Sequence, residues 1–159
     1  MASLKNVVLQ RKDVKTAGGD FPVGPLTASD ILAIYVAYRS DLESMFAKFK
    51  GGQDADSLFV DLLTTFPEIG AEIVARGAAQ GSEEEFDEAF MSQARRLDFG
   101  AQFMALEIVG ELTVSSAGGL GNLAILVERL AGKLNATMTQ EELTSLSGSQ
   151  TSGVSAPSS

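Results

Sequence analysis

The stretch Leu26-Thr27-Ala28-Ser29-Asp30-Ile31 decides the fold class, because it is a strong helix start that follows the only β-like part of the chain. Thr27 is a favourable N-cap residue, and Asp30 follows three positions later, close to the form of a capping box. Apolar side chains then continue at helical spacing: Ile31, Tyr35, Tyr38, Leu42, Met45, Phe46 and Phe49. The pattern predicts one long helix that ends at Gly51-Gly52.

Residues 4–25, which precede this stretch, predict a small hairpin or two extended pieces. Val7-Val8-Leu9 leads into the segment, Ala17-Gly18-Gly19-Asp20 is a turn signal, and Phe21-Pro22-Val23 follows it. A two-stranded hairpin is marginally stable alone in water, so we expect it to pack on the helices.

The middle of the chain predicts three further helices. The first covers Asp54–Thr65, and Pro67 begins the second, which is expected to fade at Gly77. Ser82-Glu83-Glu84-Glu85 has the capping-box form and predicts the start of the third. That helix is expected to break or kink around Asp98-Phe99-Gly100.

A further helix ends near Leu112, and Ser115–Gly121, with three glycines, predicts a flexible joint. The last predicted helix, Leu120–Leu134, carries an apolar stripe at alternating spacings of three and four: Leu120, Leu123, Val127, Leu130 and Leu134. Ile125 and Leu126 widen the stripe beyond one face. The stripe either packs on its own domain or is offered to a partner, and we take its five residues as the candidate partner-binding site.

These elements predict a mainly α protein. Residues 1–26 form the N-terminal extended or hairpin segment, and residues 27–143 form a compact bundle of about five or six helices. Residues 144–159 are rich in Ser, Thr, Gly and Pro, and we expect this tail to be disordered.

Composition excludes several classes of function. The 159 residues contain no cysteine and no histidine, which removes disulfides, thiol catalysis, the commonest general base and the commonest zinc ligand. The net charge of −9 disfavours nucleic-acid binding. The sequence contains no run of 18 apolar residues, so we predict no membrane span. No signal peptide is visible at the start of the chain. We therefore expect no enzyme activity, no cofactor and no metal.

Three local patterns have an ordinary and a functional interpretation. Gly119–Ala124 matches a dinucleotide-binding turn, but too little chain follows for that fold, which favours a simple joint. The acidic cluster Glu83, Glu84, Glu85, Asp87 and Glu88 suits the first turn of a helix better than a metal site, and a docking face for a basic partner stays open. Tyr35 and Tyr38 are expected in the core rather than in a ligand site.

Two segments resemble the tail assembly chaperones of long-tailed bacteriophages, also called pre-tape-measure proteins. Asp20–Ile31 resembles the family's pattern "FPV-x-x-L-(S/T)-x-x-D-(I/V)". Leu97–Phe103, running on to Glu111-Leu112-Thr113, is similar to "L-P-F/L-G-x-Q…L-T", with Asp98 in place of the proline. The resemblance covers about residues 5–115.

The resemblance implies a small helical chaperone, made in the infected cell, that coats the apolar tape measure protein and keeps it soluble. It also implies recruitment of tail tube protein and departure before the virion matures. Self-association is a further expectation, whereas nucleic acid and membrane are not expected partners. Two alternatives stay open, namely a structural tail or adaptor protein retained in the virion and a small acidic helical regulator.

Overall fold

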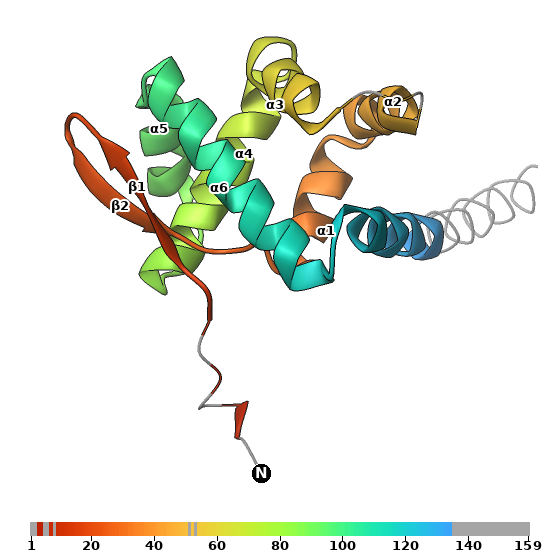
Figure 1. Cartoon of the computed structure of the whole chain (residues 1–159), viewed down its shortest axis with the longest axis horizontal. Helices are drawn as coiled ribbons and strands as arrows, with labels where there is room; N and C mark the ends of the chain where they lie inside the picture. The colour runs from red at the N-terminus through yellow and green to blue at the C-terminus, as the bar shows by residue number, and fades with distance from the viewer. Residues whose placement is uncertain (1–2, 5–6, 8, 51, 53, 135–159) are drawn as a thin grey trace, which may run out of the picture. The chain divides into compact units, whose positions relative to one another are not determined.

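The computed structural model describes residues 3–4, 7, 9–50, 52 and 54–134. Within them the chain forms one N-terminal hairpin and seven helices, which confirms the predicted mainly α fold (Figure 1). The predicted tail, residues 144–159, lies outside the described residues. The chain divides into two compact units, Met1–Leu120 and Gly121–Ser159.

The hairpin consists of β1 (Lys12–Thr16) and β2 (Gly19–Val23), which pair antiparallel with Val14 opposite Phe21. The turn lies where the sequence predicted it, and Gly19 takes a φ of 132° that favours glycine. Val14 and Val23 are fully buried, because β2 packs on α4 (Pro67–Ser82) and β1 on α6 (Phe99–Ala117). Packing on the helices supplies the stability that an isolated hairpin lacks.

The predicted long helix after Thr27 is in fact two helices, α1 (Ala28–Ala37) and α2 (Arg39–Lys50). The chain leaves the helical conformation at Tyr38, whose φ of −127° and ψ of 33° close α1. No glycine or proline marks the break, so the continuous apolar spacing of the sequence could not reveal it.

The next two helices are α3 (Ala55–Thr64), with Asp54 as N-cap, and α4, which begins at Pro67 as predicted. The prediction that α4 fades at Gly77 is wrong, because the helix continues to Ser82. A Cβ added at Gly77 would lie 2.4 Å from Cγ2 of Val109, and one at Gly81 would lie 2.3 Å from the carbonyl oxygen of Pro22. These glycines let α6 and β2 approach the helix closely.

The predicted helix start at Ser82 is also wrong. Ser82 ends α4, and Glu83 closes the helix in the left-handed conformation with a φ of 56°. The next helix, α5 (Glu88–Arg96), begins after Asp87, whose side chain accepts a hydrogen bond from the backbone N–H of Phe90. Asp87, five residues after Ser82, therefore caps this helix.

The predicted break near Asp98 is confirmed, since Asp98 caps the N-terminus of α6. Because α6 continues through Ser115 to Ala117, the joint is shorter than predicted and consists of Gly118 and Gly119, both at positive φ. The last helix begins at Leu120, as predicted, and is described as far as Leu134, the last residue that the structure describes.

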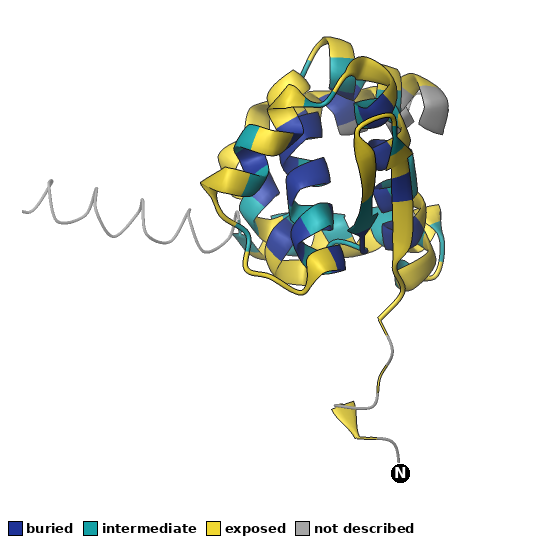
Figure 2. Ribbon diagram, turned by 90° about the vertical axis from the view of Figure 1, so that its left-hand side faces the viewer, coloured by how far each residue is buried: buried dark blue, intermediate teal, exposed yellow. Residues whose placement is uncertain are grey.

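The core of the first unit lies around α4. Its largest fully buried side chains come from four elements that meet there: Val14, Val23, Ile69, Val74, Leu106 and Val109. Figure 2 shows buried residues on the inner faces of the helices and exposed residues on their outer faces. In the described ranges no single helix is long and apolar enough to cross a membrane, and α6 with Leu120–Leu134 meets that test only as a bent pair, by length and composition.

Candidate functional site

The five predicted partner-binding residues lie along one helix, Leu120–Leu134. Leu123, Val127, Leu130 and Leu134 are half-buried, and no residue from 121 to 134 is fully buried. Leu120, Ile125 and Leu126 expose 38%, 49% and 46% of their surface. The helix is therefore apolar on more than one face, as the sequence indicated, and the assignment of a partner to it stays a prediction.

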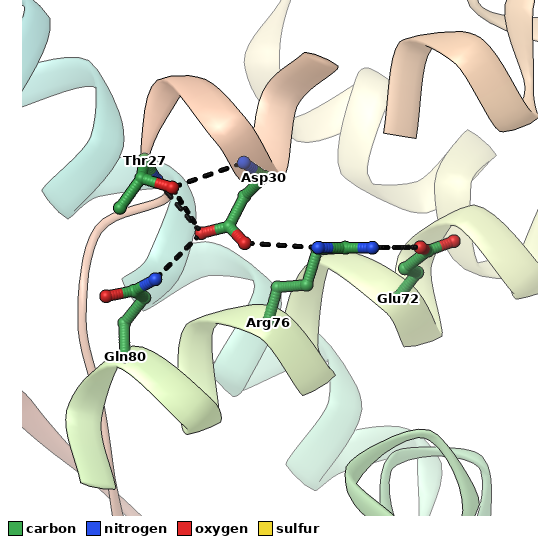
Figure 3. Close-up of polar contacts among 5 residues, drawn as sticks. All are labelled: Thr27, Asp30, Glu72, Arg76 and Gln80. Atoms are coloured by element: carbon green, nitrogen blue, oxygen red, sulfur yellow. Dashed lines mark hydrogen bonds and ion pairs between the residues drawn. The ribbon is translucent and has the colours of Figure 1, made fainter. Parts of the chain in front are cut away.

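A polar network, absent from the sequence-based predictions, joins α1 to α4 (Figure 3). Glu72, Arg76 and Gln80 stand four residues apart on α4 and face the first turn of α1. Arg76 Nη1 donates to Asp30 Oδ1 at 3.2 Å, and Gln80 Nε2 donates to Asp30 Oδ2 at 3.1 Å. Thr27 and Asp30 complete the capping box, with Thr27 N donating to Asp30 Oδ2 at 3.0 Å.

The centre of this network is the Arg76 guanidinium, which lies between two buried carboxylates. Asp30 and Glu72 expose only 5% and 8% of their surface, and Arg76 Nη2 donates to Glu72 Oε1 at 3.0 Å. The centroid of the Phe86 ring lies 4.0 Å from the guanidinium carbon, so the ring covers the cation as well. Buried charges are tolerated only when paired and hydrogen-bonded, and this arrangement meets that condition. The network therefore positions α1 against α4 and supplies no free nucleophile.

Tyr38 extends the network to the junction of α1 and α2. Partial burial, followed by the hydrogen bond with Glu72 and the charge of that carboxylate, raises the pKa of Tyr38 to about 12. Tyr35 is buried, and its hydroxyl donates to Glu43 at 3.3 Å. Both tyrosines thus bury their rings partly or wholly and bond their hydroxyls to carboxylates, which fits the expected structural role.

Three members of the acidic cluster between α4 and α5, namely Glu83, Asp87 and Glu88, make separate structural contacts. Glu83 pairs with Arg11, and Asp87 caps α5. Arg95 pairs with Glu68 of α4 at 3.0 Å and with Glu88 at 2.9 Å. The hydrogen bonds with these two carboxylates raise the pKa of Arg95 above its ordinary value. Among the described residues no group of three acidic side chains converges in a way that could hold a metal ion.

The glycine pattern at Gly119–Ala124 follows a helix and not a strand. A dinucleotide-binding turn connects a β-strand to a helix, whereas here α6 runs directly into Gly118. The backbone N–H of Gly119 bonds to the carbonyl of Val114 at 2.9 Å, which ends α6 in the manner of a glycine C-cap. The pattern therefore belongs to a helix–helix joint.

Several exposed apolar side chains outside the last helix were missed by sequence reasoning. Leu32 and Val36 are exposed one turn apart on α1, and Phe99 and Met104 are exposed on α6. The Phe99 and Phe103 rings stack with their centroids 6.3 Å apart. Periodicity could have indicated Leu32 and Val36, because both lie off the predicted core face of that helix.

The family model of the pre-tape measure protein matches residues 2–147 of this chain. The chain belongs to the pre-tape measure protein family. No curated protein and no solved structure is detectably similar to it. Membership places the role of this pre-tape measure protein in phage tail assembly, a non-enzymatic kind of role, and the family name implies association with the tape measure protein.

The two segments that resemble the family's patterns meet in this pre-tape measure protein. Leu26 N, in the first segment, donates to Thr113 Oγ1, in the second, at 3.0 Å, and that hydroxyl donates to the carbonyl of Val109 at 2.7 Å. Gln102 Nε2 donates to the carbonyl of Ala94 at 2.9 Å, which fixes the corner between α5 and α6. The polar contacts of both segments therefore hold the fold together.

Proposed function

We propose that this pre-tape measure protein keeps the tape measure protein soluble during tail assembly through apolar contacts from the helix Leu120–Leu134. It helps to recruit tail tube protein, acts in the cytoplasm of the infected host and leaves before the virion matures. Family membership supports the association with the tape measure protein, and the apolar helix supplies the contact surface.

The observation that carries the proposal is the exposure of this helix. Leu120, Ile125 and Leu126 are exposed, and the stripe beside them is only half-buried. An isolated helix of this length is marginally stable in water, so it gains stability by covering its apolar surface. On the surface of a soluble protein, exposed apolar side chains that lie close together are typical of an interaction site.

Charge supports the same function. The chain has a net charge of −9, and net charge far from zero keeps a protein and its complexes dissolved. A chaperone that covers apolar segments needs both properties, an apolar contact surface and a repulsive outer surface. Release then occurs by competition from another apolar-binding protein, for which the tail tube protein is our candidate.

The test is the double substitution Leu123→Asp and Leu130→Asp, with Asn122→Asp and Arg129→Asp as a control that adds even more negative charge off the stripe. Both pairs stand seven residues apart on the same helix, and the control pair is exposed and lies off the stripe. Each variant is co-expressed with the tape measure protein, and the soluble fraction of that protein is measured. We expect solubility to be lost with the stripe variant and kept with the control.

Circular dichroism of the purified variants separates a lost contact from a lost fold. A stripe variant that stays folded and fails to solubilise its partner supports the proposal. One that unfolds shows that the stripe is core, because buried unpaired charge exceeds the stability margin of a domain. One that folds and still solubilises the tape measure protein refutes this choice of helix. Mass spectrometry of purified virions tests departure, since a stoichiometric amount there would contradict it.

A further inference from the structure

The outer face of α6, over its first turns, carries exposed apolar side chains. Phe99 and Met104 expose 61% and 42% of their surface. Phe103 is half-buried, and its ring stacks on the ring of Phe99. Arg96, the last residue of α5, is exposed just before this face begins. Aromatic residues, methionine and arginine are enriched where proteins bind one another, so these residue types are typical of an interface.

Gly100 leaves open space in the middle of this face. Residues three and four apart are neighbours on a helix, so Gly100 lies beside both Phe103 and Met104. A Cβ added at Gly100 would meet Asp98 Oδ1 at 3.6 Å and no atom of any other segment within 4 Å. A side chain from another molecule can therefore lie against the backbone of α6 at this position.

Two charged side chains of opposite sign lie at the ends of this face. Arg96 is at its N-terminal end, and the half-buried Glu107 lies about two turns beyond Gly100. Neither forms an ion pair with another described residue. Because the chain carries a net charge of −9, two copies repel each other unless opposite charges meet at the contact. Arg96 and Glu107 supply such a pair.

We propose that this face binds the same face of a second copy of the chain, with the two α6 helices antiparallel. The two-fold axis lies level with the midpoint between Gly100 and Phe103. In this arrangement Phe99 meets Phe103 of the second copy, and Met104 fills the open space over Gly100 of the second copy. The contact covers the exposed apolar side chains of both copies, and the glycine lets the two helices approach closely.

The charged ends of the face support the antiparallel direction. Glu107 lies opposite Arg96 of the second copy, and Arg96 lies opposite Glu107 of the second copy. Each carboxylate also approaches the positive N-terminal end of the other α6. A parallel pair would place Arg96 beside Arg96 and Glu107 beside Glu107, and like charges across an interface are strongly unfavourable. The antiparallel contact is isologous and closes at two copies.

Analytical ultracentrifugation over a concentration series up to about 1 mM tests the proposal. The contact covers about three helical turns on each copy, which is less than the surface of about 800 Å² per partner that a standard interface buries. We therefore expect a weak dimer whose fraction rises with the concentration of the chain.

Four samples test the charge pairs. Arg96→Glu alone and Glu107→Arg alone should each weaken dimerisation by at least about tenfold, because two attractive pairs become repulsive. The double exchange should restore the dimer. A mixture of the two single variants should form a heterodimer, because an acidic face then meets a basic face.

Phe99→Ala tests the apolar part of the contact and should also weaken dimerisation by at least about tenfold. Val36→Ala is the matched control, because Val36 exposes 58% of its surface and lies on α1. It should dimerise like the wild type. Circular dichroism should show both variants folded, since most of each replaced side chain is exposed.

Two results would overturn the inference. One is a wild-type chain that stays monomeric over the whole concentration series. The other is a dimer that Phe99→Ala and the charge variants leave unchanged, which places the contact on another surface. The Leu123→Asp and Leu130→Asp variant should dimerise like the wild type, so failure here is distinguishable from failure of the proposed chaperone function.

Discussion

Replacing Gly81 by alanine should weaken the packing of the hairpin on α4. The added Cβ would lie 2.3 Å from the carbonyl oxygen of Pro22 and 2.5 Å from the backbone nitrogen of Val23. Ordinary carbon–oxygen contacts are about 3.3 Å, so β2 would have to move by about 1 Å. Such overpacking costs about 1–3 kcal/mol, and the helix preference of alanine recovers at most about 1 kcal/mol. We expect a net loss of about 1 kcal/mol, or about 2–4 °C in Tm.

Thermal unfolding followed by circular dichroism, together with urea titration, measures this loss. Gly70→Ala is the matched control in the same helix, because its Cβ would meet Cδ2 of Leu63 at 3.3 Å and the carbonyl of Leu62 at 3.4 Å. A flexible side chain can absorb most of that contact, so the control should keep the wild-type stability or gain slightly. If Gly81→Ala proves as stable as the wild type, β2 does not lie against α4 in solution.

Three further predictions follow from the network, the tyrosines and the tail. Asp30→Ala should cost about 3–5 kcal/mol in urea titration, because it breaks a buried ion pair, whereas Asp98→Ala removes only a cap worth about 1 kcal/mol; equal losses would contradict this. In a Tyr35→Phe variant, the absorbance of Tyr38 should titrate near pH 12. Because the folded state holds the neutral phenol, this stabilisation is complete below pH 10 and is lost as the pH rises toward 12; a midpoint near 10 would refute the raised pKa. Truncation after Leu143 should leave Tm unchanged within about 4 °C, and a larger drop would show that the tail packs.

Local signals predicted the elements whose causes are local. The capping box at Thr27 and Asp30, the turn at Ala17-Gly18 and the proline start of α4 were all identified, since each depends on neighbouring residues alone. The start of the last helix at Leu120 also followed from its own periodicity. In each case the backbone conformation satisfies hydrogen bonds or sterics within a few residues.

The errors share a different cause, which is contact between distant segments. Gly77 looks like a helix breaker, but the close approach of Val109 requires a residue without a Cβ there. The sequence did not predict the ion pair of Arg76, because its partner Asp30 lies 46 residues away in the chain. Apolar periodicity does not reveal pairs of polar residues. Sequence spacing contains no information on such pairings without the fold.

The residues that hold the first unit together are not the residues that we propose for partner binding. Several polar groups in the segments that resemble the family's patterns are used in buried or part-buried bonds, such as Thr113 to Leu26 and Asp30 to Arg76. Groups engaged in this way cannot also bind a tape measure segment without loss of the fold, since breaking a buried pair costs several kcal/mol. Partner contacts must therefore come from side chains with no role in the core of the first unit. The helix Leu120–Leu134 meets that condition, because none of its residues from 121 to 134 is fully buried.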